Sequence, residues 1–164
     1  MSDTVQGQLD DLGIGYEVVP CDPDLADTAA FCAAYGYALE DSANTIVVVG
    51  KSTPPVYAAC VVLATTRLDV NGTVRRRLGT RKASFASSDE TKDITGMMIG
   101  GVTAFGLPPS LPLWIDGAVM DRKRIILGGG SRDCKVLVSP DALHSVAGAE
   151  VVDDLARPVA DPHH

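Results

Sequence analysis

Residues 95–108 read TGMMIGGVTAFGLP, and this run places four glycines among apolar side chains. Glycine weakens the interior of a strand or helix, because it loses more backbone freedom on folding than any other residue. A core-like run with so much glycine therefore indicates one of two features. It is either a tight corner between strands or a wall where a ligand lies directly against the backbone.

The composition of the chain is that of an ordinary globular protein. Its 164 residues are 46% hydrophobic and 21% charged, which suits one domain with one sizeable core. No apolar run is long enough to span a membrane, and the acidic start MSDTVQGQLDDLG does not resemble a signal peptide. These features predict a soluble, cytoplasmic protein that does not act on membranes.

The cysteine and histidine content argues against several kinds of site. The scattered cysteines, with no C-x-x-C pair, predict free buried thiols in a reducing compartment: Cys21, Cys32, Cys60 and Cys134. Only His144 lies within the domain, on an expected surface helix, which disfavours a Ser-His-Asp or Cys-His site. The terminal His163 and His164 are given no role. We expect neither a metal ion nor a cofactor.

Two further glycine-containing stretches do not match nucleotide-binding loops. GKS at 50–52 lacks an upstream glycine at P-loop spacing and is followed by TPP, so a helix cannot begin there. LGGGSR at 127–132 lacks the G-x-G-x-x-G spacing into a helix. What remains is a site built from backbone amides and a few polar side chains.

Apolar periodicity and turn residues predict interleaved strands and helices. The expected helices cover 3–12, 27–36 (with Asp27 as cap), 73–79, 87–96 and 139–147 (with Ser139 as cap and Pro140 in the first turn). The expected strands cover 16–20, 44–50, 57–64, 111–116, 124–130 and 134–139, and EVVDDLA at 150–156 closes the fold. Without a regular βαβ period, this order predicts an α+β fold, a mixed curved sheet flanked by helices. We expect one domain over residues 1–157 and a tail over 158–164.

Several pieces of the chain, in order, resemble one family. They are NTIVVV (44–49), KASFASSDETKDITGMMIGGVTAFGLP (82–108), LPLWID (111–116), RIILGGGSRDCKVLVSPDAL (124–143) and AEVVDDLA (149–156). Over about Tyr16 to Ala156 they resemble the YbaK/EbsC-type editing domains associated with prolyl-tRNA synthetase. The resemblance implies a single α+β domain that hydrolyses the ester of a mischarged aminoacyl-tRNA, in trans or as an insert in a synthetase.

The same resemblance implies a mechanism and a set of site residues. In this family a glycine loop, here residues 100–106, lines the pocket, and its amides face the substrate carbonyl while a bound water attacks the ester. We expect the catalytic residues to be Asn44, Gly101 and Lys135. The implied substrate-binding residues are Gly100, Val102, Thr103, Ala104, Phe105, Gly106, Asp116, Gly129, Gly130, Ser131 and Arg132.

The chain departs from the family pattern at two positions. Ala104 stands where the G-x-x-x-P loop has proline, and Asn44 stands where most catalytic members carry lysine. Lys135, just beyond the second glycine turn (residues 128–131), has a charge that could replace the missing one. The alternative interpretations are a turn cap for Asn44 and a solvated edge-strand side chain for Lys135. Asp116 could instead be a turn residue, and Trp114 a core residue rather than a platform for base stacking. Arg132 could meet the phosphates of the tRNA acceptor end, or it could be a surface cation.

Charge suggests where a nucleic acid would bind. The net charge is −7, so the surface as a whole repels nucleic acid. One basic cluster stands out, comprising Arg75, Arg76, Arg77, Arg81 and Lys82. It could hold the tRNA backbone, or it could be the cationic end of a short helix before Gly79.

The leading hypothesis is a free-standing trans-editing deacylase with a mischarged aminoacyl-tRNA as substrate, a synthetase as a possible partner and no role for DNA or membranes. The first alternative is a catalytically degenerate member that binds aminoacyl-tRNA or a small ligand, because Asn44 replaces the family lysine. The second is an interaction domain that keeps the fold only as a scaffold.

Overall fold

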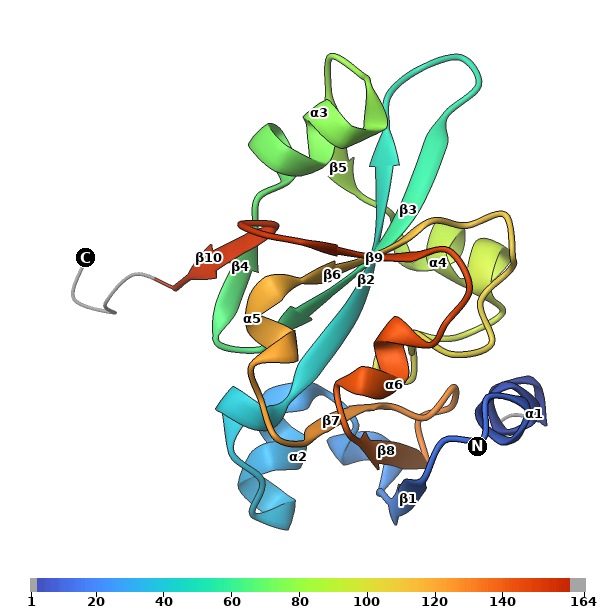
Figure 1. The fold of residues 1–164 in the computed structure, drawn as a ribbon, viewed down its shortest axis with the longest axis vertical. Coiled ribbons are helices and arrows are strands. Elements are labelled where there is room, and N and C mark those ends of the chain that lie inside the picture. Colours follow the sequence, from blue (N-terminus) through green and yellow to red (C-terminus); the bar gives the residue numbers. More distant parts are fainter. Residues whose placement is uncertain (1–2, 160–164) are drawn as a thin grey trace.

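The computed structural model describes residues 3–159 and interleaves helices with strands (Figure 1). The helices are α1 (Asp3–Asp11), α2 (Thr28–Tyr35), α3 (Arg75–Leu78), α4 (Ser88–Thr95), α5 (Gly117–Met120) and α6 (Asp141–His144). The strands are β1 (Tyr16–Pro20), β2 (Ala43–Gly50), β3 (Val56–Leu63), β4 (Thr66–Leu68), β5 (Ala83–Phe85), β6 (Leu113–Asp116), β7 (Ile125–Gly128), β8 (Cys134–Val138), β9 (Ala149–Val152) and β10 (Ala156–Pro158). The predicted α+β fold class is confirmed.

A mixed five-stranded sheet, in the order β5-β2-β3-β6-β9, forms the larger part of the fold. Its centre is the antiparallel pair β2–β3, in register from Ala43 opposite Leu63 to Gly50 opposite Val56. β6 then pairs parallel with β3, and β9 parallel with β6. The centre forms here because NTIVVVG and YAACVVLA are nearly unbroken runs of β-branched and apolar residues, which suit strands buried on both faces.

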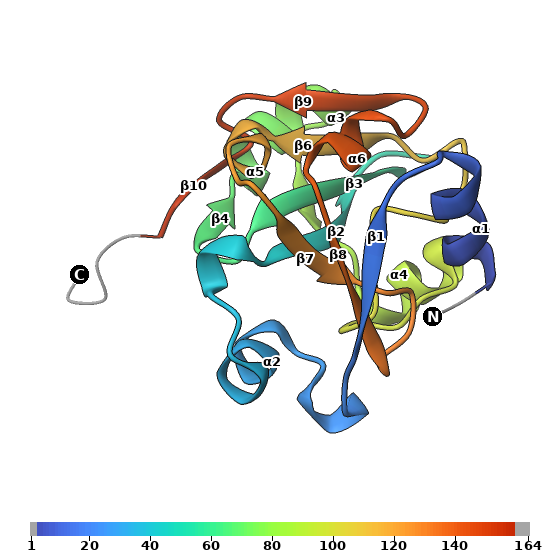
Figure 2. The same cartoon turned by 60° about the horizontal axis from the view of Figure 1, so that its bottom comes forward.

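A smaller antiparallel sheet, in the order β1-β8-β7, lies beside the first (Figure 2). A bridge between Ser42 and Ile126 joins the start of β2 to β7. On the side away from β3, β2 pairs with β5 only over Val48–Gly50. The two sheets therefore meet along the first half of β2, which β5 leaves uncovered.

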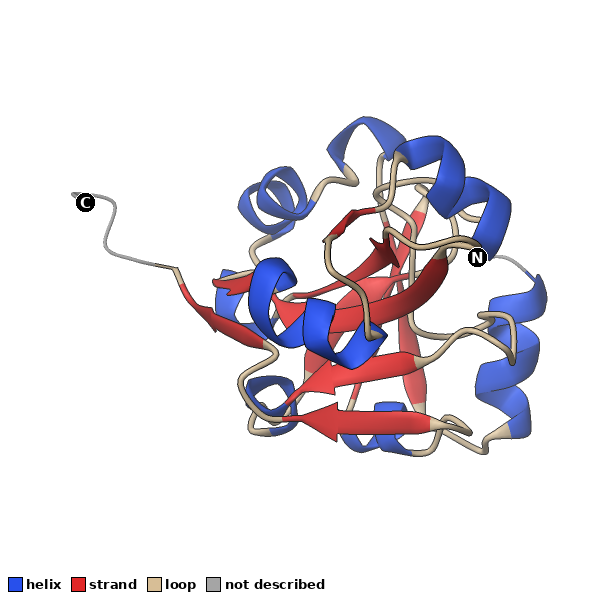
Figure 3. Ribbon diagram, turned by 90° about the horizontal axis from the view of Figure 1, so that it is seen from above, coloured by secondary structure: helices blue, strands red, loops and turns tan. Residues whose placement is uncertain are grey.

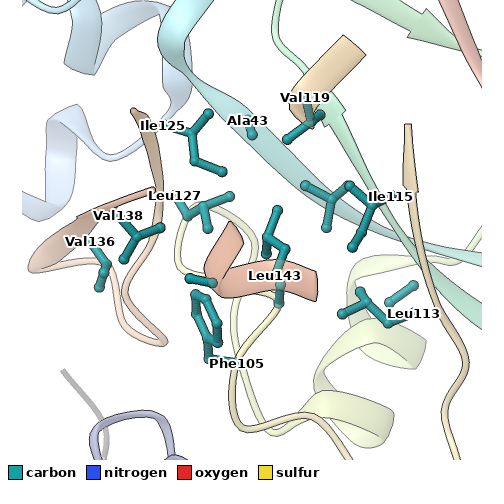
Figure 4. Packing of buried hydrophobic residues seen from close by; sticks show 14 of the residues in the cluster. Ala43, Phe105, Leu113, Ile115, Val119, Ile125, Leu127, Val136, Val138 and Leu143 are labelled. Carbon is teal, nitrogen blue, oxygen red and sulfur yellow. The ribbon is translucent and has the colours of Figure 1, made fainter. Parts of the chain in front are cut away.

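The main hydrophobic core lies between these sheets (Figure 4). Ile115 from β6, Leu127 from β7 and Phe105 from the glycine loop are each at most 1% exposed. A second cluster covers the opposite face of the large sheet and contains the buried Trp114, as one of the two interpretations predicted. The helices lie around the outside of the strands (Figure 3).

Helix boundaries largely follow the predicted signals. Gly36, Gly79 and Gly96 end α2, α3 and α4 in the left-handed conformation that glycine tolerates best. Ser87 begins α4 with a capping box, in which its hydroxyl accepts from the Glu90 amide at 3.1 Å.

Two predicted helix starts differ in detail from the structure. Asp27 occupies the cap position of α2, but its side chain makes no capping hydrogen bond and instead accepts from Arg132 at 3.4 Å. The last helix begins at Asp141, so Pro140 precedes it rather than forming its first turn. In both cases a tertiary or turn contact replaces the expected local one.

The C-terminal strand β10 pairs antiparallel with β4 and extends to Pro158. The ordered strand thus reaches one residue beyond the expected domain boundary at 157. The expected tail otherwise lies almost wholly outside the described residues, as do His163 and His164.

All four cysteines are buried, as predicted, and His144 is exposed on α6. Within residues 3–159, every helix is too short or too polar to cross a membrane. The same residues contain no group of histidine, cysteine or acidic side chains arranged to hold a metal ion.

Candidate functional site

A cavity of about 300 Å³ lies at the seam between the two sheets. Its walls come from α2 and its cap, the first half of β2, the end of β5, α4, the glycine loop and its approach, β7 and β8. The lining residues are Asp27, Thr28, Phe31, Ser42, Ala43, Asn44, Thr45, Ile46, Val47, Phe85, Ala86, Thr91, Ile99, Gly100, Val102, Ile126, Leu127, Gly128 and Lys135.

The floor of this cavity is an open strand edge. The amide of Ala86 donates to the Val47 carbonyl at 2.9 Å, which shows that Val47 directs its backbone groups away from β3 and toward β5. Because these directions alternate along a strand, Thr45 directs its N–H and C=O the same way. On that side of β2, the described chain pairs β5 only with Val48–Gly50, whereas β3 pairs with Thr45 on the other side. The Thr45 backbone therefore presents one donor and one acceptor to the cavity.

Lys135 projects into the cavity from β8 and is only 7% exposed. Its ammonium donates to the carbonyls of Ala26 at 2.5 Å and Gly100 at 2.9 Å. An ammonium has three donors, so two carbonyls leave one for a ligand. Burial lowers the pKa of this lysine below its usual range. The alternative of a solvated edge residue is wrong, because β8 is the central strand of its sheet.

Asn44 lines the same cavity from β2. Its Oδ1 accepts a hydrogen bond from the Thr28 hydroxyl at 2.6 Å. That bond fixes the side-chain amide and leaves its Nδ2 group as a donor. The predicted convergence of Asn44 and Lys135 on one pocket therefore holds in the structure, although the two residues are on different sheets.

The glycine loop lines the cavity only in part. Gly100 and Val102 reach it, whereas Gly101 packs away from it, and a Cβ at Gly101 would lie 2.6 Å from the Ser131 backbone. The Gly101 carbonyl accepts from the Gly130 amide at 2.7 Å, and its own amide donates to Met98 at 2.9 Å. Gly101 thus packs the glycine loop against the second glycine turn, and its amide is occupied by the Met98 carbonyl rather than facing the cavity.

The rest of the loop belongs to the core. Thr103, Ala104 and Phe105 are completely buried and do not line the cavity. Gly106 adopts a positive φ of 74° beside α1, where its amide donates to the Gln8 side chain at 2.6 Å. Both interpretations of TGMMIGGVTAFGLP therefore apply: its start borders the cavity, and the remainder is a packed corner.

Arg132 is occupied within the fold. Its guanidinium donates to the Pro23 carbonyl at 2.8 and 3.1 Å and to the Ile99 carbonyl at 2.7 Å. It also approaches Asp27 at 3.4 Å. The predicted phosphate-binding role is therefore not supported by its position, since Arg132 ties the segment before α2 to the glycine loop.

The remaining predicted substrate residues lie off the cavity. Gly129, Gly130 and Ser131 form the second glycine turn behind Gly101, and the Ser131 hydroxyl donates to Asp133 at 2.5 Å. Asp116 lies elsewhere, 2% exposed, where it accepts from the Ala156 amide at 3.2 Å and anchors β10. Burial raises the pKa of its carboxyl group. Asp116 is thus the buried last residue of β6 and the cap of α5 rather than a turn residue.

Comparison with known proteins decides the family. The aminoacyl-tRNA editing domain model matches residues 22–146, which include the whole cavity lining. The chain belongs to the aminoacyl-tRNA editing domain family. The crystal structure of a proposed trans-editing enzyme for prolyl tRNA synthetase superposes with a TM-score of 0.78 at 26% identity, covering 93% of this chain and 97% of that one. A hypothetical protein of known structure gives a TM-score of 0.83 at 24% identity, covering 94% and 100%.

In this editing domain, several cavity residues carry no signal in the sequence. Thr45 is 9% exposed, and its hydroxyl oxygen is buried with no hydrogen-bond partner in the structure. Thr28, Phe85 and Ile99 come from separate elements and converge only in three dimensions. A threonine inside an apolar strand could have suggested a polar floor, but nothing local distinguishes it from a packed strand residue.

The basic cluster of the editing domain divides into two parts. Arg75 donates to the Asn71 carbonyl at 2.9 Å, and Arg77 pairs with Glu150 and lies 4.9 Å from the Trp114 ring centroid. Arg81 and Lys82 immediately precede β5, whose last residue borders the cavity, and neither makes an ion pair with another described residue. Both side chains are exposed.

Proposed function

We propose that this editing domain is a trans-acting deacylase that hydrolyses the ester of a mischarged aminoacyl-tRNA in the cavity between β2, β7 and β8. The observation that carries the proposal is the convergence of Lys135 and Asn44 on one cavity, each with a donor left over. The family match and the likeness to a proposed trans-editing enzyme support the substrate class.

The size of the cavity favours a small amino acid. Its volume of about 300 Å³ is at the low end of the range for ligand pockets, roughly 300–1,000 Å³. An aminoacyl group and the terminal ribose together suit such a space, with the rest of the tRNA outside it.

The proposed reaction needs no side-chain base. A water oxygen adds to the ester carbonyl carbon, the carbonyl oxygen becomes an oxyanion, and the carbon–oxygen bond to the ribose then breaks. The ribose oxygen takes the proton released by the water, so the products are the free amino acid and the tRNA. A neighbouring ribose hydroxyl of the substrate would orient the water.

The chain's own groups would stabilise the oxyanion. The remaining Lys135 donor, the Asn44 amide and the Thr45 N–H all face the cavity. Removing one such donor typically lowers the rate by about 10²–10³. The donors differ from those that the family resemblance implied, because the Gly101 amide is occupied by Met98.

One observation favours the second candidate, a binding module without turnover. Asn44 is neutral, and its Oδ1 already accepts a hydrogen bond from Thr28. Lys135 is therefore the single cation among the described residues that line the cavity. Such a protein would hold the aminoacylated end without accelerating hydrolysis.

Deacylation rates for a panel of tRNAs, each mischarged with a different small amino acid, distinguish the deacylase from the binding module. We expect at least one ester to be hydrolysed faster in the presence of the protein than in buffer alone. Binding without acceleration across the whole panel would assign the protein to the second candidate, and neither binding nor acceleration would contradict both.

A further inference from the structure

The mouth of the cavity carries an exposed apolar rim. Phe85 is 56% exposed and Ile99 is 51% exposed, and both line the cavity. Met98, next to Ile99, is 56% exposed. Among residues 3–159 only one other large apolar side chain, Val159, is more than half exposed. Two of these four exposed apolar side chains thus line the cavity and a third is their neighbour in the sequence, which is the kind of exposure that indicates a binding surface.

Phe85 lies on the same face of the sheet as residues that line the inner part of the cavity. Phe85 is paired with Val48 across β5 and β2, so both side chains lie on the same face of the sheet. Alternation along β2 places Ile46 and Asn44 on that face as well. Phe85, Ile46 and Asn44 therefore form one wall, with the aromatic ring at the mouth and the amide at the inner end.

Positive charge directly before β5 indicates what meets the ring. Lys82 lies three residues before Phe85, about 10 Å away at the rise of a β-strand, and Arg81 precedes it. Along a single-stranded nucleic acid, each base is likewise followed at short distance by phosphates. An aromatic ring beside unpaired cations matches the combination that binds single strands through stacking and charge.

We propose that Phe85 is a stacking platform for the terminal nucleobase of the acceptor strand, with the preceding phosphates over Lys82 and Arg81. This inference rests on the proposed function for the identity of the strand. In this arrangement the ribose and aminoacyl group pass between Phe85 and Ile99 into the cavity, and the base stays at the mouth. Stacking recognises the flat face of a base, so the platform orients the end of the tRNA without reading the rest of its sequence.

Two small probes test the platform without any turnover. Adenosine 5′-monophosphate carries the base, and ribose 5-phosphate is the same ligand without it. Each is titrated by NMR into the wild type and into Phe85→Ala, Phe85→Trp and Val18→Ala. Val18 is an apolar residue of comparable exposure, 41%, on the edge strand β1 and away from the cavity.

The wild type is expected to bind the base-bearing probe more tightly than ribose 5-phosphate. Phe85→Ala should weaken that binding by roughly 5- to 150-fold and leave ribose 5-phosphate unaffected, Phe85→Trp should retain it, and Val18→Ala should match the wild type. Equal binding of the two probes by the wild type, or unchanged binding of adenosine 5′-monophosphate by Phe85→Ala, would overturn the platform. A wild-type dimer that Phe85→Ala dissociates would also overturn it, by assigning the ring to contact with a second copy. Probe binding at Phe85 with no deacylation in the tRNA panel would reject the deacylase while the nucleotide platform stands.

Discussion

At the scale of single residues, the proposed reaction depends on the one lysine that enters the cavity, Lys135. The family resemblance implies a lysine where this chain has Asn44, and the structure shows Lys135 entering the same cavity from the opposite sheet. A point charge is less demanding of direction than an amide. In the proposed reaction, Lys135 is therefore the cation that the ester oxygen meets.

This arrangement predicts how a second lysine behaves. Asn44→Lys should leave deacylation unchanged or lower it, because two like charges would share one desolvated site. In a Lys135→Ala background the same substitution should restore part of the activity. Rate constants for the single and double variants, measured on the best substrate of the panel, test both expectations. A strong rise from near zero with Asn44→Lys alone would show that the natural protein is a degenerate editing domain.

Substitution of Gly101 should lower the stability of the fold rather than remove a catalytic group. A Cβ there would lie 2.6–2.9 Å from backbone atoms of Ser131, and backbone cannot move aside as a flexible side chain can. Gly101→Ala should therefore lower the free energy of unfolding by about 1–3 kcal/mol, the cost of overpacking. Gly7 in α1 is the matched control, because a Cβ there meets nothing within 4 Å.

In the control, Gly7→Ala should raise the free energy of unfolding by roughly 0.5–1 kcal/mol, the usual gain from replacing a glycine inside a helix. Urea unfolding of both variants measures the two changes. Equal stability of Gly101→Ala and the wild type would mean that the two glycine turns are not packed together as described.

At the scale of elements, the short strand β5 links the basic residues to the cavity. It pairs with β2 only from Val48 to Gly50 and leaves the floor of the cavity open. Lys82 directly precedes β5, whose last residue, Phe85, lines the cavity. Arg75 and Arg77, by contrast, are held within the fold.

The two halves of the basic cluster should therefore differ in their effect on tRNA binding. Replacing Arg81 and Lys82 by glutamine should reduce the slope of log affinity against log salt by about 0.7 for each phosphate that the protein no longer neutralises. Replacing Arg75 and Arg77 should change the slope less. Binding isotherms at several salt concentrations provide the slopes, and an equal reduction in both variants would show that the whole cluster tracks the phosphates.

The elements also show what the sequence can and cannot predict. β2, β3 and β8 were predictable because their apolar runs are long enough to specify a strand. β4, β5, β10 and α5 were not, because each is three or four residues long and forms through its neighbours rather than through its own pattern. Asn44 and Lys135 could be predicted through the family resemblance, whereas Thr45 and Phe85 depend on register and on which strand edge is left open.

At the scale of the whole molecule, the cavity forms because the two sheets lie side by side and are joined by one bridge instead of forming one continuous sheet. The Ser42–Ile126 bridge fixes one end of the seam, and β5 closes the other. Between them the open edge of β2 faces Lys135 of the second sheet, and the paired glycine turns hold that sheet in place. Residues more than 90 positions apart in the sequence, Asn44 and Lys135, become neighbours in one cavity by this arrangement.

The most direct test of the central claim is the single-turnover deacylation rate of Lys135→Met beside that of Lys123→Met. Lys123 is exposed and is not part of the cavity lining, so it controls for the removal of one positive charge. Thermal unfolding establishes first that both variants are folded. We predict a decrease of about 10²–10³ in rate for Lys135→Met and none for Lys123→Met. A folded Lys135→Met that deacylates as fast as the wild type would contradict the assignment of this cavity as the site of hydrolysis.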